Sequence, residues 1–259
     1  MIKCCDALAW LGELPDSSVD LVATDPPYGH GRLWWDIHSP VLNPDFWVEL
    51  QRVCKRNAAI VMFAQGAFTA KLVTVGAKLW RYNLVWAKNK SGGFLNANRM
   101  PLRAHEDICV FYQALPTYNP QMTEGHAPQN WARRSGTGPN YGETEARTSR
   151  SGKTDRHPTS VLHFAVVNND DPERFHPTQK PVDLMRWIVC SYSSPGELVI
   201  DPFAGSGATG VAALQEGREF RGCDSSSRYV EQALARLAKS ACSIVRTCAL
   251  NRPTTRFSA

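Results

Sequence analysis

The amino-acid sequence predicts an α/β fold in which helices cover both faces of a mostly parallel sheet. Short apolar runs of strand length alternate with longer segments of helical periodicity, which is typical of strand–helix–strand units. One apolar run is followed by a glycine-rich turn and a helix start, as in nucleotide-binding α/β proteins. With 259 residues, 43% of them hydrophobic, the chain can bury a sizeable core.

The apolar runs predict the strands of this sheet. They occupy residues 19–24, 58–63, 82–86, 107–112, 198–200 and 219–223. Helical patterns lie between them, at residues 44–55, 66–79, 181–192, 208–216 and 226–239. We find no internal repeat, so the alternating segments are expected to form one domain rather than an array.

Residues 113–174 differ from the rest of the chain. They are rich in Gly, Ser, Thr, Asn, Pro and Arg, with few periodic apolar residues. A structureless loop of this length is unusual inside a compact domain, so we interpret it as an inserted recognition region. A dispensable mobile loop is the alternative. The predicted organisation is a first half at 1–112, the insert at 113–174, a second half of the same domain at 175–240, and a basic tail at 241–259.

The balance of charge permits a polyanionic partner. Lys and Arg outnumber Asp and Glu by 29 to 24. Basic residues stand in a window without acids at Lys88 and Arg99, and Arg133 and Arg134 follow Trp131 in the insert. Arginine mixed with aromatic and turn residues favours nucleic acid. For the basic tail, a solvated face and a nucleic-acid contact are equal alternatives.

Several classes of protein are disfavoured by the composition. The start of the chain does not resemble a signal peptide, and no apolar run is long enough to span a bilayer. We therefore expect a cytoplasmic protein that does not associate with a membrane. The eight cysteines form no C-x-x-C pair and the seven histidines no H-E-x-x-H pattern. We therefore expect buried reduced thiols and no metal site.

The glycine-rich turn near residue 205 predicts a nucleotide-like ligand. Gly205, Gly207 and Gly210 satisfy G-x-G-x-x-G, and Asp224 ends the next predicted strand. An acid at that position can accept hydrogen bonds from the ribose hydroxyls of any adenosine cofactor. By itself this pattern leaves NAD(P) and S-adenosylmethionine as alternatives.

The residues before these glycines favour one of the two cofactors. Asp201, Pro202 and Phe203 separate the strand from the glycines, whereas a dinucleotide turn usually follows its strand directly. A carboxylate at this position would repel a pyrophosphate but attract the cationic end of S-adenosylmethionine. The turn is therefore interpreted as an S-adenosylmethionine site.

A second unusual turn, TDPPYG, follows the predicted strand at 19–24. Asp25, Pro26, Pro27 and Tyr28 place hydrogen-bond acceptors, with no backbone N–H on either proline, beside an aromatic ring. A solvent-exposed turn is the simple alternative. That alternative leaves the second proline and the aromatic residue unexplained.

Together these motifs resemble the amino-group DNA methyltransferases, in the order of their β class. The matching segments are residues 25–28, 84–88, 105–108, 175–181 and 201–207. In that class the Pro-Pro-Tyr motif precedes the target-recognition region and the cofactor turn comes late, as here. The resemblance implies a Rossmann-like S-adenosylmethionine-dependent methyltransferase fold, with double-stranded DNA as partner. It also implies a homodimer.

The resemblance further implies transfer of a methyl group to the N6 amine of adenine. Asp25 would supply a carboxylate oxygen and Pro26 its backbone carbonyl to the two N–H groups of the amine. Pro27 would stiffen the turn, and Tyr28 would stack on a base rotated out of the duplex. Alternatives are transfer to cytosine N4, for which the family tends to place serine where Asp25 stands, and a non-catalytic regulator that binds DNA.

Two sets of binding residues follow from these interpretations. The cofactor site is expected to comprise Asp6, Thr178, Lys180, Asp201, Phe203, Ala204, Gly205, Gly207 and Asp224, with S-adenosylhomocysteine as the product. Within it, Thr178 and Lys180 resemble the segment that holds the methionine carboxylate of the cofactor. Asp6 lies at a position where the family places a residue near the adenine ring of the cofactor. The expected DNA contacts are Trp34, Lys88, Arg99, Arg133 and Arg134. Core packing is the alternative for Trp34, and simple surface exposure for Lys88.

Overall fold

The structure is a computed structural model that describes residues 1–31, 36–138, 140 and 142–250. It divides into two compact units. The first unit joins Met1–Asn119 to Ser160–Ala259, and the second is Pro120–Thr159. Each unit is described separately below.

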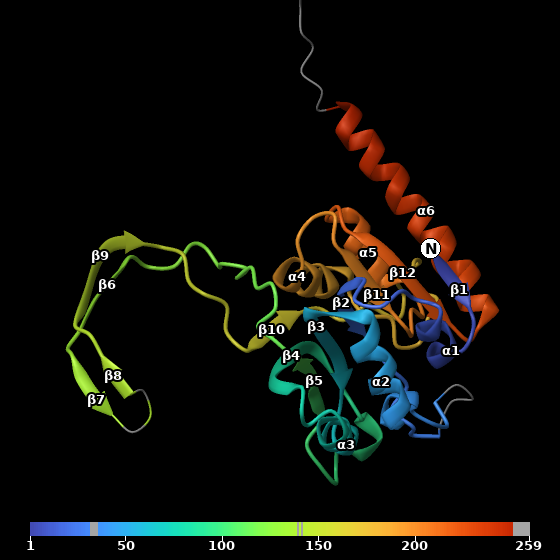
Figure 1. Cartoon of the computed structure of the whole chain (residues 1–259), viewed down its shortest axis with the longest axis horizontal. Coiled ribbons are helices and arrows are strands. Elements are labelled where there is room, and N and C mark those ends of the chain that lie inside the picture. Colours follow the sequence, from blue (N-terminus) through green and yellow to red (C-terminus); the bar gives the residue numbers. More distant parts are fainter. Residues whose placement is uncertain (32–35, 139, 141, 251–259) are drawn as a thin grey trace, which may run out of the picture. The chain divides into compact units, whose positions relative to one another are not determined.

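The first unit is built on a twisted sheet (Figure 1). Within the described residues this sheet has eight strands, in the order β1 (Ile2–Cys4), β12 (Glu219–Asp224), β11 (Leu198–Asp201), β2 (Val19–Thr24), β3 (Cys54–Ala64), β5 (Arg103–Phe111), β4 (Trp80–Gly92) and β10 (Val161–Phe164). Neighbours pair in parallel except at β5, which runs antiparallel to β3 and β4. The predicted mostly parallel α/β sheet is confirmed.

Helices cover both faces of the sheet. One face packs against α1 (Ala7–Gly12), α2 (Pro44–Val53) and α3 (Ala67–Val75), and the other against α4 (Val182–Tyr192), α5 (Ala208–Gln215) and α6 (Ser227–Leu250). Two short 3-10 helices are η1 (Pro40–Leu42) and η2 (Phe94–Asn96). Side chains alternate across the strands, so that Leu21 and Ala23 of β2 enter one core and Val22 the other.

Helix α2 illustrates how local sequence signals start and orient these helices. The Asn43 side chain accepts a hydrogen bond from the Asp45 N–H at 3.0 Å, and Pro44 occupies the first turn, where its missing N–H costs nothing. The buried side chains of the helix recur at helical spacing and are Phe46, Trp47, Leu50 and Val53.

Two boundaries predicted from the sequence need correction. Strand β10 extends the main sheet, with Val161 opposite Val85, so the second unit is narrower than the predicted insert at 113–174. Helix α6 continues to Leu250, so residues 241–250 are helical rather than a separate tail. The remaining tail, 251–259, lies outside the described residues. Strand β1 and helix α1 were not predicted, because such short elements carry little periodic signal.

The second unit contains two short antiparallel pairs rather than irregular backbone alone. Strand β6 (Gln129–Arg133) pairs with β9 (Arg147–Lys153), and β7 (Gly136–Gly138) pairs with β8 (Gly142–Thr144). No helix in the described part of the chain is long and apolar enough to cross a membrane.

The first unit holds the two chain ends that flank the second. On one side, Asn119 donates from its backbone N–H to Ser191 O at 2.8 Å and from its side chain to Cys190 O and Ser193 O. On the other side, Ser160 O accepts from the N–H of Val85 on β4 at 2.8 Å. Both flanking residues are therefore fixed to regular elements of the first unit.

Candidate active site

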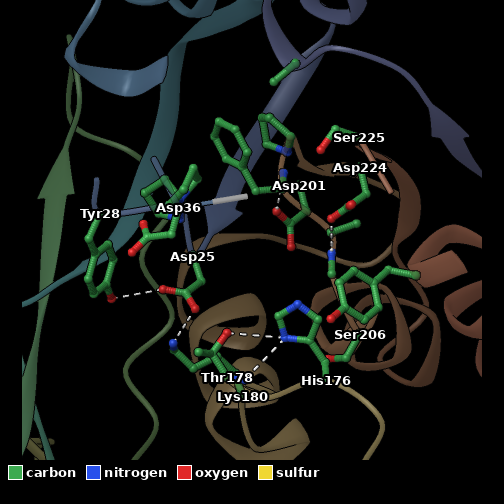
Figure 2. Close-up of a pocket in the computed structure, with 18 of the residues that line it drawn as sticks. Asp25, Tyr28, Asp36, His176, Thr178, Lys180, Asp201, Ser206, Asp224 and Ser225 are labelled. Atoms are coloured by element: carbon green, nitrogen blue, oxygen red, sulfur yellow. Dashed lines mark hydrogen bonds and ion pairs between the residues drawn. The ribbon is translucent and has the colours of Figure 1, made fainter. Parts of the chain in front are cut away.

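The carboxyl ends of β2, β11 and β12 meet at one edge of the sheet. These strands are parallel neighbours, with Ile200 opposite Val22 and Asp201 opposite Gly222. The turns that follow them therefore lie together, as ligand-binding turns do in open α/β sheets. A cavity of about 560 Å³ opens at this edge (Figure 2). Its lining includes Asp25, Pro26, Pro27, Tyr28, Asp201, Phe203, Ala204, Gly205 and Asp224, so both predicted motifs share one cavity.

The glycine-rich turn needs glycine for conformation and for space. Gly205 and Gly207 have φ values of +47° and +70°, in the left-handed region that other residues rarely adopt. A Cβ on Gly207 would lie 3.1 Å from the Cβ of Ala233, and one on Gly205 would face the ring of His176 at 3.6 Å. Gly207 is not among the residues that line the cavity, so its role is to shape the turn.

Asp224 fixes this turn from the end of β12. Its Oδ2 accepts from the Gly205 N–H and its Oδ1 from the Ser226 N–H, both at 2.9 Å. Burial raises the pKa of Asp224, and the two N–H donors oppose that rise. Each carboxylate oxygen retains a second lone pair, so Asp224 can still accept from a ligand hydroxyl.

Asp201 lines the cavity but is bonded mainly to its own protein. Its carboxylate accepts from the hydroxyls of Thr24 and Thr209 at 2.5 and 2.6 Å, and from the Phe203 N–H at 3.1 Å. It is 3% exposed, and burial raises its pKa to about 6. Asp201 therefore joins β2, the turn and α5, in addition to any contact with a cofactor.

The acceptors of the Pro-Pro-Tyr turn point into the same cavity. Asp25 Oδ1 accepts from the Tyr28 hydroxyl at 2.9 Å, and Asp25 Oδ2 from Lys180 Nζ. The Tyr28 ring stacks on Phe68 at 4.7 Å between centroids. A base could therefore stack only on the opposite face of the Tyr28 ring.

Asp36 supports the exit of this turn and was not predicted from the sequence. Its side chain is buried and accepts from the backbone N–H groups of Gly29 at 2.8 Å and His30 at 3.1 Å. A single acid in a loop gives no periodic signal in the sequence. Asp36 is nonetheless close enough in sequence to Gly29 and His30 for its side chain to accept from their backbone N–H groups. Trp34, a predicted DNA contact, lies outside the described residues.

Lys180 lines the cavity and lies close to two carboxylates. Its Nζ bonds to Asp25 Oδ2 and lies 3.4 Å from Glu106 Oε2. Burial opposes the charge of Lys180, but the carboxylates of Asp25 and Glu106 outweigh it and raise the pKa of the ammonium. The structure thus pairs Lys180 with Asp25, and its contact with the methionine carboxylate of the cofactor stays a prediction.

Glu106, also not predicted as a site residue, links Lys180 to Lys88. Glu106 Oε1 bonds to Lys88 Nζ, which lies 4.7 Å from the centroid of the Trp86 ring. The burial of Glu106 is offset by the two lysines, which lower its pKa. Lys88 is only 17% exposed, so the alternative of a simple surface lysine is wrong, and a phosphate contact by Lys88 stays a prediction.

His176 and Thr178 line the same cavity and contact each other. The Nδ1 of His176 accepts from the Thr178 N–H at 3.3 Å, and its ring contacts that of Tyr229, with centroids 4.4 Å apart. Burial, with Lys180 and Arg174 nearby, lowers the pKa of His176 to about 4. His176 is therefore neutral near pH 7 and is suited to packing against a ligand.

The other predicted cofactor residues, Asp6, Phe203 and Ala204, also line the cavity. Asp6 caps helix α1 by accepting from the N–H groups of Leu8 and Ala9. The Phe203 ring stacks on Phe46 with centroids 5.7 Å apart. Among the residues that the structure describes, no three His, Cys, Asp or Glu side chains gather to hold a metal ion.

The predicted DNA contacts that the structure describes belong to both units. Arg99 is exposed in the loop between β4 and β5, in the first unit. Arg133 lies on β6 opposite Arg147, and Arg134 follows it as an exposed residue of the second unit. Their role in DNA binding stays a prediction.

Comparison with known proteins agrees with this site. Residues 19–235 match the N6/N4 DNA methylase family. The DNA adenine methyltransferase YhdJ of Escherichia coli (strain K12) is 30% identical over 245 residues, covering 90% of this chain and 80% of YhdJ. The type II methyltransferase M.BglII of Bacillus subtilis is 28% identical over 248 residues, covering 88% of this chain and 66% of M.BglII.

Solved structures share the fold. The M1.HpyAVI–SAM complex has a TM-score of 0.61 at 22% sequence identity. The alignment covers 92% of this chain and 99% of the M1.HpyAVI chain. The cytosine-N4-specific PvuII DNA methyltransferase has a TM-score of 0.62 at 16% identity, with 95% and 92% covered. Because the family match spans most of the sequence and includes both turns that line the cavity, the chain belongs to the N6/N4 DNA methylase family.

Proposed function

We propose that this chain transfers a methyl group from S-adenosylmethionine to the N6 amine of adenine in duplex DNA. The observation that carries the proposal is the single cavity shared by the Asp25–Tyr28 turn and the glycine-rich turn. The likeness to YhdJ, named as an adenine methyltransferase, supports adenine as the target.

The residues of the cavity fit S-adenosylmethionine. A volume of about 560 Å³ lies within the range of roughly 300–1,000 Å³ that is usual for small-molecule sites. Asp224 retains lone pairs for ribose hydroxyls, and the left-handed Gly205 lets a ligand approach the backbone. Phe203 and His176 offer ring surfaces. When bound, S-adenosylmethionine supplies an electrophilic methyl group on a sulfonium centre.

The catalytic turn would act on the amine by accepting hydrogen bonds. The lone pair of an aromatic amine is delocalised into its ring, which makes the nitrogen a poor nucleophile. Asp25 and the backbone carbonyl of Pro26 can accept the two N–H groups and favour a pyramidal nitrogen whose lone pair is available. Asp25 can then take the proton that the nitrogen loses after methylation. Such catalysis depends on positioning and electrostatics.

The DNA partner would have to present a base outside the stack, since the amine is inaccessible within a duplex. The face of the Tyr28 ring opposite Phe68 would offer a stacking surface for that base. Arg99, Arg133 and Arg134 are proposed to contact the phosphate backbone. A homodimer is a further prediction from the resemblance, and a cytoplasmic location is a further prediction from the composition.

The experiment that tests the proposal is a product analysis. The protein is incubated with S-adenosylmethionine labelled in the methyl group and with mixed-sequence duplex DNA, and the DNA is digested to nucleosides for mass spectrometry. We expect labelled N6-methyladenosine from the wild type and none from Asp25→Asn. Label only in N4-methylcytosine would identify the cytosine alternative. No label from protein that binds both S-adenosylmethionine and DNA would favour a non-catalytic regulator.

A further inference from the structure

Charged side chains of alternating sign form a network of ion pairs that ends at Asp25. Lys88 of β4 bonds to Glu106 of β5, whose second oxygen lies near Lys180, and Lys180 bonds to Asp25 after β2. The antiparallel pairing of β4 and β5, with Trp86 opposite Glu106, brings Lys88 close to Glu106. The four side chains carry two positive and two negative charges, so this network has no net charge.

The four charges lie mostly within the protein. The exposed fractions of the side chains are 17% for Lys88, 13% for Glu106, 10% for Lys180 and 21% for Asp25. Burying ion pairs costs desolvation energy that apolar packing would avoid, so such a network is weak evidence for a purely stabilising role. Its position against Asp25 favours a role in the reaction instead.

The network is asymmetric at Glu106. Its Oε1 is bonded to Lys88, but its Oε2, which is buried, accepts no hydrogen bond from the described residues and lies 3.4 Å from Lys180 Nζ. A buried acceptor without a hydrogen bond is unfavourable. A small rotation of the Lys180 side chain would give Glu106 Oε2 that bond and weaken the bond to Asp25.

We propose that Lys180 is a positioning residue that holds Asp25 in the base-free protein and shifts to Glu106 Oε2 when the target amine donates to Asp25. The inference rests on the proposed function and adds a role for two residues in it. Each oxygen of Asp25 already accepts one hydrogen bond in the structure, Oδ1 from the Tyr28 hydroxyl and Oδ2 from the Lys180 ammonium. An ammonium at Asp25 competes with the amine and makes the carboxylate less basic, whereas a shift to Glu106 relieves both effects.

Other groups around Asp25 and Lys180 do not replace this pair. The titratable side chains that face them from the neighbouring elements are Tyr28, Lys88, Glu106, His176 and Asp201. His176 is neutral above its lowered pKa of about 4 and adds no charge near pH 7. Burial and nearby carboxylates raise the pKa of Tyr28, so it remains a neutral donor. Among the residues that the structure describes, Lys180 is thus the cation paired with Asp25.

The first test measures the pKa of Asp25 without methyl transfer. The protein is labelled with ¹³C at the aspartate carboxyl carbons and titrated by NMR, and the Asp25 signal is assigned by its loss in Asp25→Asn. Lys180→Met should raise the pKa of Asp25, because its counter-ion is gone. Glu106→Gln should lower it, because Lys180 then pairs with Asp25 alone. The control Lys90→Met, at an exposed lysine of β4, should leave it unchanged.

Opposite shifts in the two variants would show that Lys180 and Glu106 both act on the charge of Asp25, as the proposal requires, since a general loss of packing would not move them apart. Shifts of the same sign, or no shift in correctly folded Glu106→Gln, would overturn it. This titration is independent of turnover. If the two variants show opposite shifts but the wild type methylates no DNA, the result therefore supports the ion-pair network and overturns the proposed function.

The second test measures kinetics and cofactor binding. Glu106→Gln should lower kcat by ~10-fold or more while leaving the Kd for S-adenosylmethionine, measured by calorimetry, unchanged. Adding Glu106→Gln to Lys180→Met should cause little further loss of kcat, because Glu106 acts through Lys180. Lys180→Arg, which keeps the positive charge, should recover part of the kcat lost in Lys180→Met. If Lys180→Met instead weakens cofactor binding and leaves the pKa of Asp25 unchanged, Lys180 holds the cofactor and the proposal is wrong.

Discussion

The hydroxyl of Thr24 donates a buried hydrogen bond of 2.5 Å to the carboxylate of Asp201, across 177 residues of sequence. Thr24 is the last residue of β2 and immediately precedes Asp25, whereas Asp201 ends β11 and begins the glycine-rich turn. One short bond therefore joins the catalytic turn to the cofactor turn. The relative position of the two turns depends on the sheet register and on this bond.

The ionisation of Asp201 should make stability depend on pH. Burial raises its pKa from an ordinary value of 3.8 to about 6, so protonation favours the folded state. This contribution is fully present below about pH 4 and is lost as the pH rises through 6. Relative to Asp201→Asn, the wild type should gain roughly 2–3 kcal/mol of unfolding free energy between pH 7 and pH 4.

Urea denaturation of both proteins at several pH values measures this difference. The exposed Asp170→Asn serves as a control and should follow the wild type throughout. A constant difference between wild type and Asp201→Asn across this range would show that Asp201 titrates normally.

Removal of the Asp224 carboxylate should weaken cofactor binding. Asp224 bonds to the Gly205 N–H and is placed to accept ribose hydroxyls, so Asp224→Ala loses both the ligand contact and the support of the turn. We expect the Kd for S-adenosylmethionine to rise by ~10-fold or more, as measured by isothermal calorimetry. Glu219→Gln, at an exposed position on the same strand, should bind like the wild type. Equal affinities in all three proteins would contradict the assignment of Asp224.

The third glycine of the turn motif should matter for packing. A Cβ on Gly210 would lie 2.5 Å from Cε1 of Phe220 and 2.8 Å from Cδ2 of Leu237, closer than real contacts allow. Gly210→Ala should therefore lower the unfolding free energy by roughly 1–3 kcal/mol through overpacking, despite the better helix propensity of alanine. Gly12→Ala, where no atom lies within 4 Å, is the matched control. Thermal unfolding of both variants decides the point, and similar melting temperatures would contradict the packing argument.

DNA affinity should depend on salt through arginines of the second unit. Arg133→Ala combined with Arg134→Ala removes two cations, so we expect weaker binding and a slope of log K against log salt that is smaller by about 2. Fluorescence anisotropy with duplex DNA at several salt concentrations measures the slope. The control pair Arg56→Ala with Lys78→Ala removes two exposed cations of the first unit. An identical slope in both double variants would mean that Arg133 and Arg134 do not contact phosphates.

Short-range sequence signals were sufficient for much of the sheet and for both turns. Strand β2 matches its predicted range of 19–24, since its apolar run ends at a sharp change of composition. Asp25 and Gly205 were found because each sits in a dense local motif after a strand. The parallel register of β2 and β11 then brings the two motifs to one cavity.

Long-range partners could not be predicted in the same way. The contact between Lys180 and Asp25 spans 155 residues and depends on how the loop before α4 crosses the sheet edge. Glu106 belongs to a strand whose antiparallel direction is not visible in its own residues. Strand β10 is four residues long and becomes regular only by pairing with β4. Tertiary geometry, rather than local propensity, decided these features.

The anchored ends of the second unit have an evolutionary consequence. Asn119 and Ser160 are held by bonds to α4, the loop after it and β4, and these bonds involve no residue of 120–159. Mutations, insertions or exchange with a relative's segment between these two points would replace none of the residues that line the cavity of the first unit. If residues 120–159 read the target, new sequence specificities can arise by recombination there while the methyl-transfer chemistry is inherited intact.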